Sequence, residues 1–67
     1  MDDEPMLQWF SWDHLPPHLQ AVSRKFWAVS NELVEILPRT PERTVALRKL
    51  LESKDAAVRC AVAKHRE

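Results

Sequence analysis

A proline-bounded break divides this chain into two helical patterns and constrains its fold more than any other feature. The break is the run Pro38-Arg39-Thr40-Pro41. Pro38 disfavours continuation of a helix that arrives before it, whereas Pro41 suits the first position of a new helix. The Thr40 hydroxyl can accept from the free N–H groups of that new first turn. A connection this short predicts two antiparallel neighbouring helices.

The first helix is predicted from about Pro17 to Leu37. Pro16 and Pro17 exclude a helix that runs through this point but permit one to begin there. The apolar residues that follow recur at alternating intervals of three and four, which is a heptad seam. They are Leu19, Val22, Phe26, Val29, Leu33 and Ile36.

The second helix, from about Pro41 to near Lys64, carries two apolar stripes. The bulkier stripe is Leu47, Leu51, Val58 and Val62, and the smaller is Ala46, Leu50, Ser53, Ala57 and Cys60. Two helices share one interface, so the chain has more apolar surface than that interface can bury. We therefore expect an all-α fold: an antiparallel two-helix hairpin with a short aromatic N-terminal segment, assembling as a homo-oligomer. The alternative is a monomer whose Trp-rich start folds over the hairpin.

The length of 67 residues permits one small domain, 1–67, with a modest core of its own. Residues 1–9 are expected to be flexible or to contact a neighbouring copy. The single cysteine, Cys60, permits no internal disulfide and is expected to be a small buried apolar residue. There is no long apolar run and no signal sequence, so we expect a soluble, cytosolic chain with no membrane partner.

The net charge is zero but unevenly distributed. Residues 1–15 carry four acids and no base, whereas residues 38–67 carry eight bases against four acids. A long nucleic acid is not expected as a partner because nonspecific affinity needs a strong positive field. A small anion held by a few local cations remains compatible with this distribution.

Catalysis, cofactors and metals find little support in the sequence. There is no glycine for a phosphate loop, no plausible Ser-His-Asp set, and no pair of carboxylates with a core that would raise a pKa. His14 and His18 are four residues apart, but Pro16 and Pro17 lie between them, so a shared metal-binding face is not expected. We therefore expect no enzyme activity, no cofactor and no metal.

The start of the second helix is the first candidate site. Free N–H groups, the Thr44 hydroxyl and the cations Arg43 and Arg48 together offer what a phosphate needs. The alternative interpretation is an ordinary capped helix start with solvated charges, in which Thr44 bonds back to its own helix.

The same region resembles a known family. The run Thr40-x-Glu42-Arg43-Thr44-Val45-Ala46-Leu47-x-Lys49-Leu50-x-Glu52-Ser53 is similar to the signature Ser-x-Glu-Lys-Ser-Leu-Ala-Leu-x-Lys-Leu-x-Glu-Ala. That signature belongs to a helical-hairpin domain of phage immune-evasion sponges, which include the anti-CBASS cyclic-oligonucleotide sponge and the Thoeris anti-defence sponge. The N-terminal run Phe10-Ser11-Trp12-Asp13-His14-x-Pro16-Pro17 also resembles the start of these relatives. Arg48 and Ala56 depart from the family pattern, which has a threonine and commonly an aromatic there.

The resemblance implies a compact helical oligomer, often a hexamer, with no catalytic activity. Such proteins sequester the cyclic dinucleotides or trinucleotides of bacterial anti-phage signalling in the cytoplasm of the infected host. Their ligands lie between protomers, and the signal does not reach its effector.

A cyclic oligonucleotide presents flat bases and charged phosphates, so aromatic and cationic side chains would bind it. Trp12 is the expected stacking residue because it occupies the second aromatic position of the family-like start. Arg24 and Lys25 flank the seam of the first helix and would face a neighbour's aromatic start. The alternatives are that Trp12 is hydrophobic glue between protomers, that the cations are solvated, and that Trp27 only packs. The rival function is a small helical interaction or scaffold protein that binds a host or phage protein.

Overall fold

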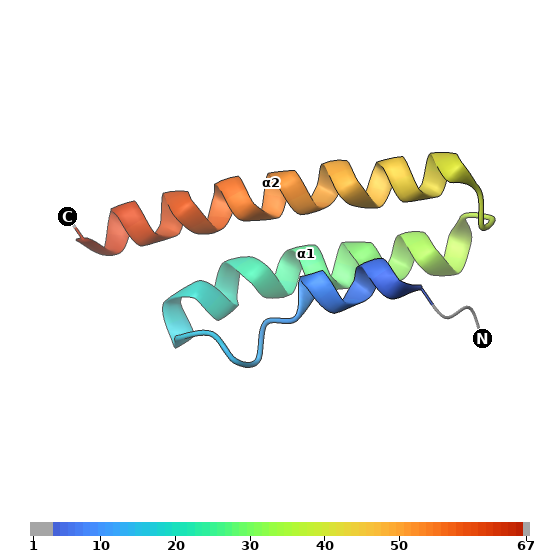
Figure 1. Ribbon diagram of the computed structural model, residues 1–67. Helices are drawn as coiled ribbons and strands as arrows, with labels where there is room; N and C mark the ends of the chain where they lie inside the picture. Colours follow the sequence, from blue (N-terminus) through green and yellow to red (C-terminus); the bar gives the residue numbers. More distant parts are fainter. Residues whose placement is uncertain (1–3, 67) are drawn as a thin grey trace.

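Two long helices and one short helix make up the part of the chain that the structure describes. The computed structural model describes residues 4–66, and side chains for residues 4–64. The elements are a 3-10 helix, η1 (Pro5–Phe10), followed by α1 (Pro17–Ile36) and α2 (Pro41–Arg66). The chain reverses after α1, so that α2 lies alongside it, and η1 packs against both (Figure 1). The prediction of an all-helical fold is confirmed, with no strand between residues 4 and 66.

The helix ends follow from the prolines and the cap. Pro17 is the first residue of α1, and the carbonyl of Pro16 accepts from the N–H of Gln20 at 3.0 Å. At the start of α2, Thr40 Oγ1 accepts from the backbone N–H of Arg43 at 3.2 Å. The predicted threonine cap is therefore confirmed, and the carbonyl of Thr40 accepts from the same N–H at 3.1 Å.

The buried centre of α1 is formed by small residues. Ser23 and Ser30, one heptad apart, are 1% and 0% exposed, and the largest fully buried side chains are Phe10 and Leu47. Because both η1 and α2 pack on α1, the helix backbone is approached closely from two directions. Serine fits such a position, where a larger side chain would hold the elements apart.

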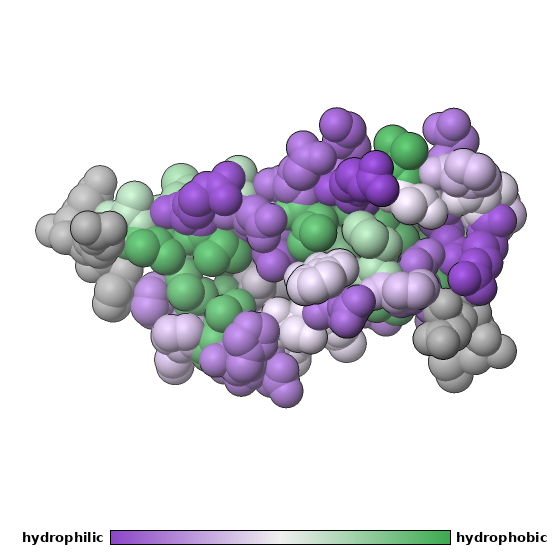
Figure 2. All heavy atoms as spheres, in the orientation of Figure 1, coloured by the Kyte–Doolittle hydropathy of each residue, from purple (hydrophilic) through white to green (hydrophobic). Residues whose placement is uncertain are grey.

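The predicted heptad seam of α1 is wrong at two of its members. Val29 is 42% exposed and Ile36 is 72% exposed, whereas Phe26 and Leu33 are half-buried. The heptad spacing of the apolar residues is consistent with one apolar face of α1. The face of α1 that packs against the other helices is instead centred on Ser23 and Ser30. Val29 and Ile36 are therefore displaced to its edge and remain uncovered. Figure 2 shows hydrophobic side chains over the boundary between the two long helices and polar side chains along the outer edge of α2.

The described part of the N-terminal segment is helical. Residues 1–3 of the segment that was expected to be flexible or to contact a neighbouring copy lie outside the described part of the chain, and Pro5–Phe10 form η1. Glu4 caps η1 by accepting from the N–H of Met6 at 3.2 Å, and Phe10 at the end of η1 is fully buried. Burial of the phenylalanine ring contributes about 1.5–3 kcal/mol toward holding η1 against the other two helices.

Cys60 is exposed, contrary to the expectation that it would be buried. It belongs to the smaller stripe of α2, and Ser53 of that stripe is also exposed, whereas Leu47 of the bulkier stripe is fully buried. The remaining members of both stripes are half-buried. Within residues 4–66, no helix has both the length and the apolar character that a membrane crossing would require.

Candidate aromatic and cationic site

Trp12 lies in the segment between η1 and α1, and hydrogen bonds fix this segment. The carbonyl of Trp12 accepts from the N–H of Leu15 at 3.1 Å, closing a turn. The Gln20 side chain then donates from Nε2 to the carbonyl of Leu15 at 2.8 Å and to that of Asp13 at 3.3 Å. Because Gln20 is on α1, these bonds set the position of Trp12 relative to that helix.

Trp12 contacts two side chains of α1. The guanidinium carbon of Arg24 lies 5.2 Å from the centroid of the Trp12 ring, within the range of a cation–π contact. The rings of Trp12 and Trp27 meet edge to face, with centroids 6.3 Å apart and an interplanar angle of 69°. We call Trp12, Arg24 and Trp27 the tryptophan–arginine cluster. It places two indole rings and a fixed cation on one face of the molecule.

Two shallow hollows border this cluster. One, of about 270 Å³, is lined by Ser11, Trp12, Asp13 and Trp27. The other, of about 420 Å³, is lined by Ala21, Arg24, Lys25 and Ala28. One hollow therefore offers aromatic surface with a carboxylate, and the other offers two cations. Together they present the two kinds of group that a base and a phosphate need.

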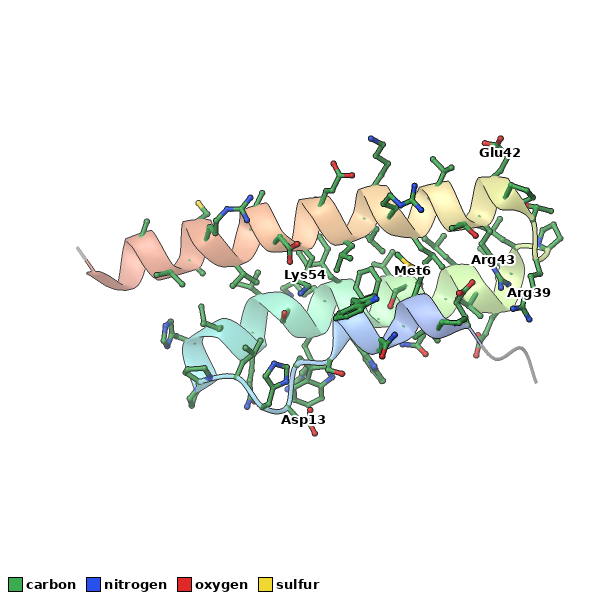
Figure 3. The ribbon with its side chains drawn as sticks, in the orientation of Figure 1. Met6, Asp13, Arg39, Glu42, Arg43 and Lys54 are labelled. Carbon is green, nitrogen blue, oxygen red and sulfur yellow. The ribbon has the colours of Figure 1, made fainter. Side chains whose placement is uncertain are left out.

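Arg43 lies inside the fold and has structural contacts. Its side chain is 1% exposed, and Nη2 is 3.0 Å from Oε1 of Glu4, whose side chain is 7% exposed. Its Nη1 donates to the carbonyls of Val34 and Leu37 at 3.4 and 3.3 Å, at the end of α1. Figure 3 shows the side chain directed from α2 toward that end of α1. Arg43 therefore joins η1, α1 and α2, and its guanidinium is not presented at the surface of the single chain.

The predicted site residues fall into two groups. Trp12, Arg24 and Lys25 lie together, as described above. Thr44 is half-buried and Arg48 is exposed, both near the start of α2. Val34, which Arg43 contacts, lies ten residues beyond Arg24 on α1, or about 15 Å along the helix axis. Arg43 and Arg24 therefore lie at different points along α1.

Trp27 and Asp13 also belong to this surface, which the sequence did not predict. Trp27 is 42% exposed, and its ring packs edge to face against that of Trp12. A signal for it was present, because Arg24 and Trp27 are three residues apart and share a helix face. The sequence contains no comparable signal for Asp13, because the position of its turn depends on a hydrogen bond from the Gln20 side chain.

The side chains at this surface offer noncovalent contacts. Among the described residues, no three His, Cys, Asp or Glu side chains gather in a way that would hold a metal ion. Stacking on indole rings and contacts to a guanidinium and an ammonium group are reversible, noncovalent interactions. Comparison of the chain with protein-family models, with curated proteins and with solved structures finds no match.

Proposed function

We propose that this protein sequesters cyclic oligonucleotide second messengers of bacterial anti-phage signalling, cyclic dinucleotides or trinucleotides, without cleaving them. The observation that carries the proposal is the tryptophan–arginine cluster, in which Arg24 lies 5.2 Å from the centroid of the Trp12 ring beside Trp27. The similarity of Thr40–Ser53 and Phe10–Pro17 to the phage sponge domain supports the same assignment.

The cluster suits both parts of such a ligand. Each base has a flat π face, and stacking on an aromatic side chain contributes about 1–3 kcal/mol per base. Each phosphodiester carries a negative charge, which Arg24 and the adjacent Lys25 would neutralise. Because Arg24 already lies over an indole ring, part of the entropy cost of fixing its long side chain is met before the ligand arrives.

A sponge needs tight binding and no chemical step. It removes the messenger from solution in proportion to its own concentration, and the effector is then not activated. In this proposal the protein acts in the cytoplasm of the infected bacterial host, where the messenger is made. The ligand is released intact when the protein unfolds.

Assembly is part of the proposal. The chain would form an antiparallel helical hairpin that associates as a homo-oligomer, and a hexamer is common in the family it resembles. The uncovered side chains Val29, Ile36 and Val45 support this, because they are 42%, 72% and 44% exposed. In such an assembly, Thr44 and Arg48 of one copy would complete the site around the cluster of a neighbour.

Equilibrium binding of cyclic dinucleotides and cyclic trinucleotides to single variants tests the site. Trp12→Ala removes a stacking platform and should weaken binding by roughly ten-fold or more, whereas Trp12→Phe keeps a ring and should lose less. Arg24→Gln should weaken binding most at low salt, where its charge is least screened. Lys49→Gln is the matched control, because Lys49 is exposed on α2 and pairs with Glu52 at 3.8 Å. Equal losses in the Lys49 control and the Arg24 variant would contradict the assignment.

The second candidate function is an interaction module that binds a host or phage protein. The exposed apolar side chains of Val29, Ile36 and Val45 would also suit an interface with another protein. Ile36 is the most exposed of the three, at 72%. The two functions give opposite results in the titration. A scaffold would bind neither class of cyclic nucleotide, and its Trp12 variants would behave as the native chain does.

A further inference from the structure

One side of α1 stays uncovered within the chain and carries a stripe of side chains with a regular spacing. All of its members are exposed, so neither α2 nor η1 covers them. A helix completes a turn in about 3.6 residues, and the spacing of these residues gathers them along one side of it. They are Ala21, Lys25, Ala28, Val29, Glu32 and Ile36, which we call the outer face of α1.

The positions of the outer face are symmetric about its midpoint, which lies between Ala28 and Val29. Position 21 mirrors position 36, and position 25 mirrors position 32. Such a surface can pair with a second copy of itself through a two-fold axis at the midpoint. Each position of one chain then lies opposite its mirror position in the other.

The charges at mirror positions are opposite in sign. An antiparallel second copy would set Lys25 of one chain against Glu32 of the other, and the two-fold axis would make this contact twice. A parallel copy would instead place Lys25 beside Lys25 and Glu32 beside Glu32, and like charges across an interface oppose association. The charges therefore favour an antiparallel second copy.

The sizes of the side chains at mirror positions are complementary as well. Ala21 mirrors Ile36, and Ala28 mirrors Val29, so a small side chain always faces a larger one. Both alanines line the hollow of about 420 Å³ on this side of α1. The larger side chains of the second copy would fill the space beside the alanines, as close packing requires. The exposed Val29 and Ile36 would thereby be removed from water.

We propose that two copies of this chain pair through the outer face of α1, antiparallel and about a two-fold axis at its midpoint. The pairing specifies one interface of the assembly proposed above, on which it rests, and it does not depend on the ligand. Arg24 and Trp27 are not members of the outer face, so the tryptophan–arginine cluster would border the interface. Lys25 has three N–H donors, so a contact with Glu32 of the second copy leaves donors for a phosphate at the cluster.

Charge reversal tests the pairing in the absence of any ligand. Lys25→Glu and Glu32→Lys each place like charges at two points of the interface and should raise the dissociation constant roughly ten-fold or more. Sedimentation measures this change, and circular dichroism checks that the helices are intact. An equimolar mixture of the two variants should recover association, because every mirror pair is then opposite in charge again. Glu52→Lys, the same change at an exposed position of α2, is the matched control and should associate as the native chain does.

Cross-linking tests the direction of the second copy. In a Cys60→Ala chain, a short bismaleimide should join Ala21→Cys to Ile36→Cys when the two variants are mixed. Ala21→Cys alone should not cross-link, since the two copies of that position would lie about 22 Å apart along the paired helices. A parallel second copy would give the reverse result.

The results that would contradict the pairing are distinct from those that would contradict the proposed function. A native chain that sediments as a monomer would overturn both the pairing and the proposed assembly. A native oligomer that neither charge variant weakens, that mixing does not restore, or in which Ala21→Cys cross-links to itself would overturn the pairing alone. Because association is measured without ligand, a failure of cyclic nucleotides to bind would count against the proposed function only.

Discussion

Arg43 of α2 and Glu4 at the start of η1 form a buried ion pair, with 3.0 Å between Nη2 and Oε1. The two residues are 39 positions apart in the sequence. The same guanidinium donates to the carbonyls of Val34 and Leu37, which the end of α1 would otherwise leave without an intrahelical partner. One side chain thus connects all three helices, and two of its contacts are to backbone rather than to another charge.

Arg43→Ala should destabilise the fold strongly. It leaves the Glu4 carboxylate and two helix-end carbonyls without their partner, and breaking a buried pair from one side costs about 3 kcal/mol or more. The total free energy of unfolding of a domain this size is only a few kcal/mol. Chemical denaturation should therefore show that most of the variant is unfolded even without denaturant. Thermal unfolding followed by circular dichroism measures the same effect.

Two further variants show which contact matters. Glu4→Gln keeps an acceptor for Arg43 and should cost less than Arg43→Ala. Arg48→Ala, an exposed arginine one turn along α2, should leave unfolding nearly unchanged. If Arg43→Ala were no more destabilising than Arg48→Ala, Arg43 would be free for a ligand and its structural role would be wrong.

Gln20→Ala should loosen the segment that carries Trp12. The amide of Gln20 donates to the carbonyls of Leu15 and Asp13, so its loss removes both bonds that hold the turn to α1. We expect weaker cyclic-oligonucleotide binding and a change in tryptophan fluorescence, with little change in the unfolding midpoint. Asn31→Ala, which removes a bond to the carbonyl of Trp27 at 2.8 Å, is a matched control on the same helix. If the Gln20 variant bound the ligand as tightly as the native chain does, Trp12 would not need the hydrogen bonds from Gln20 to hold its position.

Local signals account for what the sequence predicted correctly. The prolines and Thr40 act within one turn of the backbone, so both helices and the cap were predictable. The burial of Arg43 was not, because its partner Glu4 and the carbonyls of α1 are distant in the sequence. The seam of α1 failed at Val29 and Ile36 for a related reason. Spacing indicates which residues share a face, but the packing of both α2 and η1 on α1 determines which face is covered.

The candidate site was predictable in part. Arg24 and Trp27 share a helix face by spacing alone, but their contact with Trp12 depends on a turn outside any helix.

Ile36→Lys should dissociate the proposed oligomer and leave the helices intact. Ile36 is 72% exposed in the single chain, so a charge there is solvated in a monomer but is costly inside an interface. Sedimentation at micromolar concentration should show smaller particles with unchanged circular dichroism. Leu33→Asp, at a half-buried position of α1, should instead unfold or dissociate the protein. A native chain that sediments as a monomer would contradict the assembly.

Cys60→Ala should leave both stability and ligand binding nearly unchanged. The thiol is exposed on α2, so its removal creates no cavity in the chain. Unfolding midpoints and cyclic-oligonucleotide affinities of the two proteins should agree within error. A large loss of affinity with an intact fold would give the thiol a direct role in binding.

The most direct test of the proposed function is titration with cyclic dinucleotides and cyclic trinucleotides, followed by denaturation and chromatography of the released ligand. We predict saturable binding of at least one of these ligands and its recovery as the intact cyclic compound. No binding of either class would favour the interaction module, and recovery of a linear product would replace the sponge with a nuclease.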